Sequence, residues 1–247
     1  MMDDFGFPKS AGTFRFRAET RIVRRLLGGM ERSGTVLDLG SGVGFWAEEF
    51  ARSFSLVVAV EGSSALYQTL EERCAPYSNV TTLQGDVLSF EPAGVYDLVF
   101  LGGLLMYLDE NAVIDLLQKL IPHLGSNGII LCRESTVQGK TVTRSGDYPV
   151  VYRTVDDYKR IFKQCGLLLN HVERNKPYVV MQMGCELIKI WKRVIPEPFW
   201  ALQIIGRLMY GAIRVAAPLI QSIVRVFGFL FPNLENHFFV LGIEKGA

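Results

Sequence analysis

Residues 36–44, Val-Leu-Asp-Leu-Gly-Ser-Gly-Val-Gly, join a short apolar run to three glycines at every second position. The apolar run predicts a buried strand, and the glycines predict a tight turn that a ligand can approach without meeting a Cβ. A second apolar run, 56–60, ends at Glu61, which follows Gly40 by 21 positions. Strand, glycine turn, helix, strand and acid is the layout of a nucleoside-binding α/β unit.

The glycine spacing separates two classes of cofactor. The dinucleotide fingerprint needs a glycine at position 45, where this chain has Phe45. This departure disfavours NAD and FAD. A tight turn without any ligand would also explain the three glycines, but Asp38 before them and Glu61 after them favour ligand binding.

Strand-like and helix-like segments alternate along most of the chain. The expected strands are 35–39, 56–60, 80–84, 96–101, 128–133, 167–174 and 237–243. The expected helices are 14–30, 45–53, 63–74, 110–120 and 154–165. Strands rich in Val, Leu and Ile, separated by helices of about ten residues, predict a parallel sheet that is covered on both faces.

Composition indicates a globular protein, since 49% of the 247 residues are hydrophobic. The four cysteines form no CxxC pair and the three histidines have no metal-ligand spacing, so no metal is expected. Residues 1–10 contain no signal-peptide core, and a cytoplasmic location is expected, with the periphery of a membrane as the alternative.

Charge is unevenly distributed. Residues 9–32 contain seven basic and two acidic residues, and 187–231 contain six basic and one acidic, so each segment carries +5. Because the whole chain carries +1, the remainder carries −9. Two basic segments in an otherwise acidic chain suggest charged partners. Solvated faces of ordinary helices are the alternative explanation.

Residues 187–231 interrupt the alternation of strands and helices. They are strongly apolar, and Gln203, Arg207, Arg214, Gln221 and Arg225 recur at spacings of 4, 7, 7 and 4. On a helix this spacing makes one narrow polar stripe with a wide apolar surface around it. Arg214 lies in the middle of the segment, which argues against a helix that spans a bilayer.

Four motifs in order carry a family resemblance: 36–44, 58–61 (Val-Ala-Val-Glu), 84–87 (Gln-Gly-Asp-Val) and 96–100 (Tyr-Asp-Leu-Val-Phe). Over roughly residues 34 to 175 and the last strand, the chain resembles class I S-adenosylmethionine-dependent methyltransferases. The resemblance implies an α/β, Rossmann-like methyltransferase fold: a mostly parallel seven-stranded sheet with helices on both faces and a helical insertion between the last two strands. The expected domains are an N-terminal helical lid (1–33), an S-adenosylmethionine-binding methyltransferase domain (34–183 plus 236–247) and an apolar, basic helical insertion (184–235).

The resemblance implies S-adenosyl-L-methionine as the cofactor and gives roles around it. The glycines let the loop pass against the ribose and the methionine part, and Asp38 orients that loop and, through water, the methionine amine. Glu61 accepts hydrogen bonds from both ribose hydroxyls. Asp86, whose alternative role is a helix cap, accepts from the adenine amino group, and Val87 donates its backbone N–H to a ring nitrogen. The full cofactor set is Asp38, Gly40, Ser41, Gly42, Gly44, Trp46, Glu61, Gly62, Asp86, Val87, Leu101 and Gly102.

Candidates for the acceptor side must lie near the carboxyl ends of the strands. The catalytic candidates are Glu134, Tyr152 and Tyr107. Glu134 is the first choice for a proton acceptor or an acceptor-binding group, and an ion pair with Arg133 or Arg153 is its alternative role. The tyrosines have packing as their alternative.

The predicted function is methyl transfer from S-adenosylmethionine to oxygen or nitrogen of a small-molecule or lipid-like acceptor. No nucleic acid is expected as a partner, because 101–104 reads Leu-Gly-Gly-Leu where amino-DNA and RNA enzymes of the family carry Asn/Asp-Pro-Pro-aromatic. The alternatives are a catalytically idle cofactor-binding or assembly protein and an NAD-dependent oxidoreductase.

Three roles stay open for the insertion, 187–231. It could form a specificity lid, a homodimer interface or a peripheral membrane contact. In the membrane role, Trp191, Phe199 and Trp200 would be interfacial anchors, and a lipid-like acceptor would follow.

Overall fold

The computed structural model describes residues 9–28, 30, 34–146, 148–191, 203–226 and 232–243. The chain divides into two compact units. Residues 26–173 and 237–247 form one, here called the sheet unit, and residues 1–25 and 174–236 form the other, the helical unit. The second unit boundary, at 173/174, lies ten residues before the expected one. The lid role of 1–33 stays a prediction, and 1–8, 29 and 31–33 lie outside the described residues.

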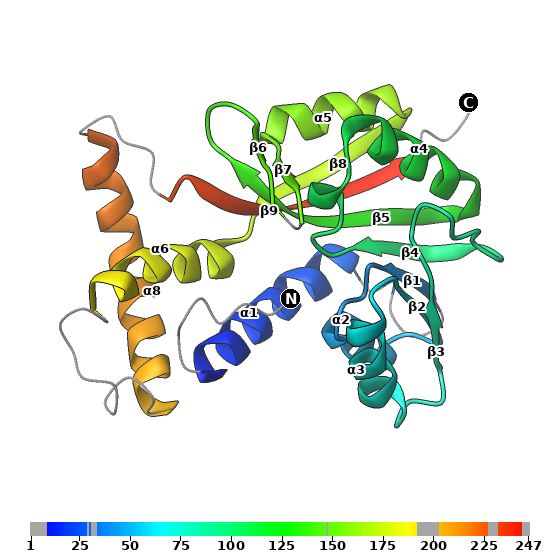
Figure 1. The fold of residues 1–247 in the computed structure, drawn as a ribbon, viewed down its shortest axis with the longest axis horizontal. Coiled ribbons are helices and arrows are strands. Elements are labelled where there is room, and N and C mark those ends of the chain that lie inside the picture. Colours follow the sequence, from blue (N-terminus) through cyan, green and yellow to red (C-terminus); the bar gives the residue numbers. More distant parts are fainter. Residues whose placement is uncertain are drawn as a thin grey trace. The chain divides into compact units, whose positions relative to one another are not determined.

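A seven-stranded sheet has the strand order β3-β2-β1-β4-β5-β9-β8, with β1 between β2 and β4 (Figure 1). The strands are β1 (Thr35–Leu39), β2 (Leu56–Glu61), β3 (Val80–Gln84), β4 (Tyr96–Leu101), β5 (Leu124–Val137), β8 (Leu167–Arg174) and β9 (Leu234–Ile243). Neighbouring strands from β3 to β5 are parallel, which confirms the expected, mostly parallel architecture. Leu39 lies opposite both Val60 and Leu101, so β1, β2 and β4 end at one edge.

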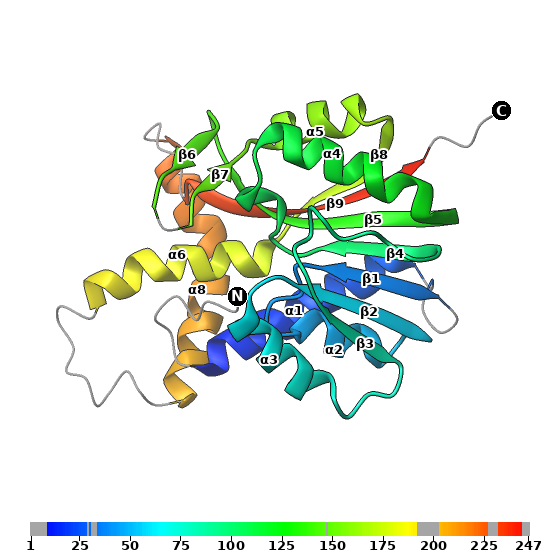
Figure 2. The same ribbon diagram turned by 45° about the vertical axis from the view of Figure 1, so that its right-hand side comes forward.

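Helices cover both faces of the sheet. They are α2 (Phe45–Ala51), α3 (Ser64–Cys74), α4 (Glu110–Leu120) and α5 (Val155–Gln164), with 3-10 turns η1 (Leu105–Tyr107) and η2 (Ile121–His123) (Figure 2). Successive side chains of a strand point to opposite faces. On β4 the Phe100 ring packs against Phe50 of α2, with ring centroids 5.1 Å apart. The next residue, Leu101, is buried in the same cluster as Leu117 of α4.

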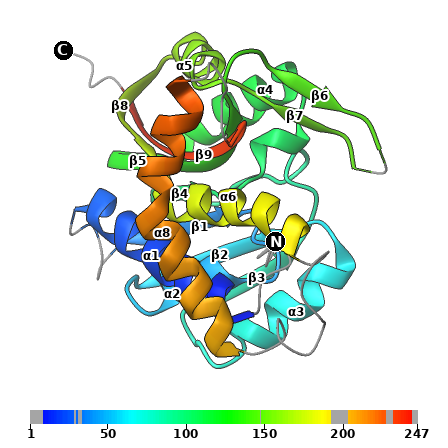
Figure 3. The same cartoon turned by 90° about the vertical axis from the view of Figure 1, so that its left-hand side faces the viewer.

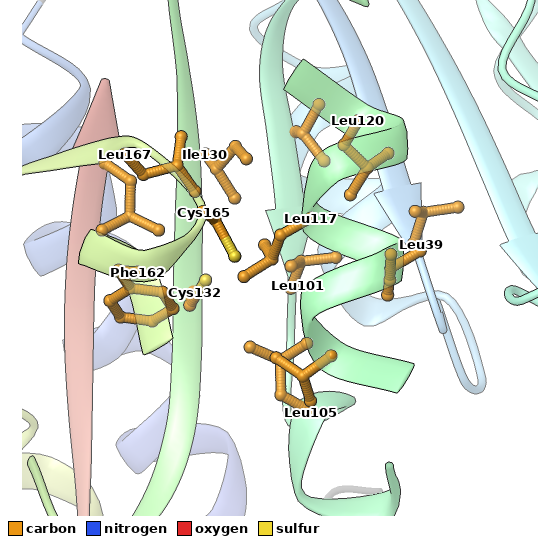
Figure 4. Packing of buried hydrophobic residues seen from close by; sticks show 14 of the residues in the cluster. Leu39, Leu101, Leu105, Leu117, Leu120, Ile130, Cys132, Phe162, Cys165 and Leu167 are labelled. Atoms are coloured by element: carbon orange, nitrogen blue, oxygen red, sulfur yellow. The ribbon is translucent and has the colours of Figure 1, made fainter. Parts of the chain in front are cut away.

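The main core lies between the sheet and helices α4 and α5 (Figure 4). Helix α4 forms because its buried residues Val113, Leu116, Leu117 and Leu120 recur at helical spacing. The Asp109 side chain accepts the Ala112 N–H and caps its first turn. On the other side of the cluster, Phe162 of α5 lies close to Cys132 of β5.

Two features between β4 and α5 depart from the expected elements. Strand β5 starts at Leu124 rather than at Gly128, and its register with β4 shifts between Tyr96 and Leu98. An antiparallel hairpin, β6 (Val142–Arg144) with β7 (Val150–Tyr152), follows β5. Its strands have only three residues each, and all of β6 is exposed, so no apolar alternation marks it in the sequence.

The helical unit contains α6 (Lys176–Trp191), α8 (Gln203–Val226) and most of α1 (Figure 3). Helix α1 is Lys9–Leu27, and the boundary of the unit lies after Arg25. The core of the unit joins Val179, Met181 and Met183 of α6 to Tyr210 and Ile213 of α8. None of the described helices is long and apolar enough to cross a bilayer. The expected anchors Phe199 and Trp200, and the side chain of Trp191, lie outside the described residues.

Polar groups are also buried in the helical unit. The Asn175 amide donates to Glu19 Oε1 at 3.1 Å and to Asn236 Oδ1 at 2.8 Å, and Arg15 donates to the same Glu19 oxygen. Arg174 pairs with Glu235. These bonds hold the start of α6 to α1 and to the first residues of β9, because a buried polar group is costly unless it is bonded.

Candidate active site

The glycine turn follows β1 directly. The backbone N–H groups of Gly40 and Ser41 both donate to Val60 O, at 2.9 and 3.0 Å, which ties the turn to β2. Gly40, Gly42 and Gly44 all have positive φ, at 70°, 58° and 82°. A Cβ at Gly44 would lie 2.7 Å from the Leu70 side chain, whereas nothing among the described residues lies within 4 Å of a Cβ placed at Gly42. The turn is thus closely packed at its end and open at its centre.

Glu61 joins the end of β2 to this turn. Its Oε2 accepts the N–H of Gly42 at 2.8 Å, and its Oε1 accepts the N–H of Ser63 at 2.8 Å. The residue is only 9% exposed. A carboxylate held by two backbone N–H groups has a fixed direction, and each oxygen keeps a lone pair for a further donor.

Asp38 is a buried carboxyl group at the end of β1, only 1% exposed. Burial raises the pKa of Asp38 to about 7. Hydrogen bonding by the Ser41 side chain lowers this pKa, and the charge of the nearby Glu61 raises it. The Oδ2 atom of Asp38 has no hydrogen-bond partner among the described residues. A buried oxygen with an open lone pair suits a donor supplied by a ligand.

The residues expected around adenine follow β3. Gly85 N donates to Glu61 O at 3.1 Å, so this loop starts beside Glu61. Asp86 is exposed, and its Oδ1 accepts the N–H of Leu88 at 3.3 Å, while Val87 is buried. The Asp86 carboxylate therefore supports a local turn. Gly62 is exposed beside this loop.

Trp46 lies in the first turn of α2, just after the glycine turn. Its ring packs against Phe100, with centroids 5.0 Å apart, and stacks with Phe50 at 5.8 Å. These contacts fix the start of α2 on the sheet. A role of Trp46 toward the cofactor stays a prediction.

A loop after β4, residues 102–108, lies at this edge of the sheet, where the acceptor is expected. Glu134 lies at 0% exposure near the end of β5, and its Oε1 accepts the N–H groups of Leu104 and Leu105, at 3.0 and 3.1 Å. Its Oε2 is buried with no hydrogen-bond partner among the described residues. Burial raises the pKa of Glu134 to about 7, although the loop N–H groups and Arg133 act in the opposite direction.

Arg153 binds carbonyl groups of the same loop. Its guanidinium donates to Leu105 O at 2.8 Å and to Leu108 O at 2.7 Å, and the residue is 2% exposed. Glu134 and Arg153 thus bind N–H and C=O groups of one short segment. We call residues 102–108 with these two side chains the loop clamp. The sequence did not reveal the role of Arg153, because its partners lie 48 and 45 residues earlier.

The loop clamp also reaches the glycine turn. A Cβ placed on Gly40 would lie 3.0 Å from Leu104 Cδ1, so the loop packs directly on the first glycine. Gly102 and the buried Leu101 lie at the start of this loop. The fold therefore brings the cofactor candidates of β1 and β4 together.

The two candidate tyrosines lie on neighbouring elements. Tyr107 belongs to η1 and is 49% exposed, and β7, which carries Tyr152, contacts η1. The Arg144 guanidinium lies over the Tyr152 ring, 5.2 Å from its centroid. The fold thus brings the two elements that carry these tyrosines into contact, and the catalytic role of both stays a prediction.

A pocket of about 170 Å³ lies beside the hairpin. Its lining residues are Asp109, Glu110, Thr141, Val151, Arg153 and Asp157. All three carboxylates already have partners: Asp109 caps α4, Glu110 pairs with Arg160, and Asp157 accepts from Thr154. These acids therefore support the starts of α4 and α5.

Comparison with known proteins finds methyltransferases. A family described as "Methyltransferase domain" matches residues 36–128. Phosphoethanolamine N-methyltransferase 3 of Arabidopsis thaliana is 30% identical over 162 residues, which are 64% of this chain and 32% of that protein. Ribosomal RNA small subunit methyltransferase A of Bacillus licheniformis is 32% identical over 132 residues, 49% of this chain and 44% of that protein. The chain thus matches less than half the length of these relatives.

Solved structures share the fold. An O-methyltransferase of Brevibacillus brevis, in complex with S-adenosyl-L-homocysteine, has a TM-score of 0.60 and 16% identity, and the match covers 92% of this chain and 74% of that one. The [4+2]-cyclase SpnF has a TM-score of 0.63 and 13% identity, with coverage of 92% and 82%. The motif series, the strand order and the family match lead to one conclusion: residues 36–128 belong to a methyltransferase domain, and the sheet unit that contains them has the fold of class I S-adenosylmethionine-dependent methyltransferases.

Proposed function

We propose that this chain transfers a methyl group from S-adenosyl-L-methionine to the nitrogen of a small-molecule amine. The observation that carries the proposal is the glycine turn, with its open centre at Gly42 and the oriented carboxylate of Glu61, together with a buried Asp38 oxygen that has no hydrogen-bond partner in the described part of the chain. When bound, S-adenosylmethionine supplies an activated methyl group on a sulfonium. The protein then has to orient the acceptor in line with that methyl and to exclude water.

The proposed roles of the cofactor residues combine the family resemblance with the geometry of Glu61 and Asp38. Glu61 keeps acceptor capacity beyond its bonds to Gly42 and Ser63, which suits the two ribose hydroxyls. Asp38 Oδ2 suits the methionine amine, reached through water as the family resemblance implies. Asp86 and Val87 are assigned to adenine.

An amine acceptor is favoured over a hydroxyl by two arguments. An amine that binds as its ammonium must first lose a proton to solvent, and the neutral amine then needs little more than orientation, whereas a hydroxyl benefits from a general base during the transfer. Glu134, the first candidate for that base, is buried and has Oε1 bound to two loop N–H groups. The relatives include a phosphoethanolamine N-methyltransferase, which supports nitrogen in a small molecule.

Charge argues against a nucleic-acid acceptor, although ribosomal RNA methyltransferases are among the relatives. The sheet unit, residues 26–173 and 237–247, contains 12 basic and 19 acidic residues and carries −7. Nucleic-acid binding relies on Lys and Arg that neutralise phosphates. An acidic unit instead attracts a cationic amine.

Glu134 acts in this proposal as a positioning residue. It holds the loop clamp, whose Leu104 packs on Gly40 and whose Tyr107 lies on the acceptor side. The sequence-based role of Glu134 as a proton acceptor makes a different prediction, and the two can be separated by substitution.

Glu61→Ala should weaken the binding of S-adenosylhomocysteine roughly tenfold to a hundredfold, because the sugar hydroxyls lose a charged acceptor. Isothermal titration calorimetry measures the affinity, and thermal unfolding checks that the turn still folds. Glu72→Ala, an exposed carboxylate of α3, removes the same charge and should leave the affinity unchanged. Equal affinities for Glu61→Ala and the parent would remove Glu61 from the site.

The affinity for S-adenosylhomocysteine should rise with pH and level off above about pH 7. Burial raises the pKa of Asp38 to about 7, and the ligand ammonium favours the carboxylate, so the carboxyl must lose its proton on binding below that pH. Since about nine-tenths of such a group is protonated one unit below its pKa, affinity should be roughly tenfold lower at about pH 6 than at about pH 8. Asp38→Asn should bind weakly with a flat profile. A parent profile that is equally flat would contradict the role of Asp38.

Glu134→Gln should keep most of the loop order and turnover, because its amide oxygen can still accept the Leu104 and Leu105 N–H groups. Glu134→Ala leaves both groups unpaired, at a cost of about 1–3 kcal/mol each. Hydrogen–deuterium exchange of residues 102–108 should therefore speed up in Glu134→Ala and stay slow in Glu134→Gln. Glu91→Ala, an exposed carboxylate, is the control. Turnover lost equally in both Glu134 variants, with slow exchange in Glu134→Gln, would establish Glu134 as the base instead.

The proposed activity is tested with methyl-labelled S-adenosylmethionine. Phosphoethanolamine and a panel of small primary amines, each beside the hydroxyl compound of equal size, serve as acceptors. Label should enter an amine and not its hydroxyl counterpart, and Glu61→Ala should reduce the rate. Transfer only to hydroxyl compounds would show that oxygen, and not nitrogen, accepts the methyl group. Tight cofactor binding without any labelled product would favour the alternative, a cofactor-binding or assembly protein.

A further inference from the structure

Helix α8 of the helical unit has two apolar sides. One side, with Tyr210, Ile213 and Ala217, is buried against α6 residues that include Val179 and Met183. Through these residues α8 packs against α6 within the helical unit. Figure 3 shows α8 crossing α6. A second apolar side remains outside this core.

We call this second side the α8 stripe. Its members are Leu208, Val215, Leu219, Ile223 and Val226, which are 67%, 83%, 64%, 49% and 84% exposed. At 100° per residue these five positions fall within an arc of about 80°, and they extend over about 27 Å of helix. Single exposed apolar residues are ordinary, but a continuous row of large ones marks an interaction surface.

The charge of the helical unit indicates what kind of partner would suit the α8 stripe. The helical unit, residues 1–25 and 174–236, contains 14 basic and 6 acidic residues and carries +8. Residues 203–226 include three arginines and no acidic residue, and Arg214, beside Val215 in sequence, is exposed. An apolar row on a strongly basic unit fits a surface that offers both hydrocarbon and negative charge.

We propose that the α8 stripe docks on the surface of an anionic phospholipid bilayer, with its helix lying in the plane of the membrane. The apolar side chains enter the boundary between headgroups and acyl chains, and the basic residues attract the lipid phosphates. A surface orientation also fits the finding that no described helix can cross a bilayer. A second copy of this chain is a poorer occupant, because it would bring two units of +8 together.

Co-sedimentation of the full chain with vesicles tests this surface. The protein should bind vesicles of phosphatidylcholine mixed with phosphatidylserine at about 0.1 M salt, bind phosphatidylcholine alone at least tenfold more weakly, and be released at about 0.5 M salt. The triple variant Val215→Ser, Leu219→Ser, Val226→Ser should lose at least tenfold in binding. A control variant, Leu88→Ser with Val95→Ser, changes exposed apolar residues of the sheet unit and should bind like the parent.

Three results would overturn the proposal. One is protein that stays in the supernatant with the anionic vesicles, and another is a triple variant that binds them as well as the parent does. The third is a parent that is dimeric without lipid and becomes monomeric in the triple variant, which would assign the stripe to a second copy. Affinity for S-adenosylhomocysteine is measured on every variant, so failure of the membrane contact is distinguishable from failure of the proposed function.

Discussion

The carboxylate of Glu61 is the contact on which the proposed site depends. One oxygen binds Gly42 in the turn after β1, the other binds Ser63 at the start of α3, and the backbone oxygen of the same residue binds Gly85 after β3. Three loops that the parallel sheet brings to one edge are thus fixed by a single residue. A parallel sheet gathers the carboxyl ends of its strands, and the polar groups at that edge decide what it can bind.

Local features of the sequence predicted this half of the site. Buried strands with Val, Leu and Ile, a glycine turn and an acid at a strand end are each visible within a few residues, and β1, β3 and β4 have the expected bounds. The loop clamp was not predictable in the same way. Glu134 and its partner Leu104 are 30 residues apart, and the hairpin β6–β7 is too short and too exposed to produce a periodic pattern. Contacts of this kind arise from tertiary packing and leave no local signal.

The two units have opposite charge, −7 for the sheet unit and +8 for the helical unit, although the whole chain carries only +1. The net charge of the whole chain therefore hides the separation of acidic and basic residues between the two units. An acidic unit suits the proposed amine acceptor, which is a cation before it loses its proton, and a basic unit with an exposed apolar row suits the proposed anionic surface. Both proposals follow from the same separation of charge.

The crystal structure of the chain in complex with S-adenosylhomocysteine tests the central claim most directly. The account predicts density for the ligand along the glycine turn, with both sugar hydroxyls within hydrogen-bond distance of the Glu61 oxygens and the amino group beside Asp38. An unoccupied turn at saturating ligand, or a ligand whose sugar lies away from Glu61, would contradict it.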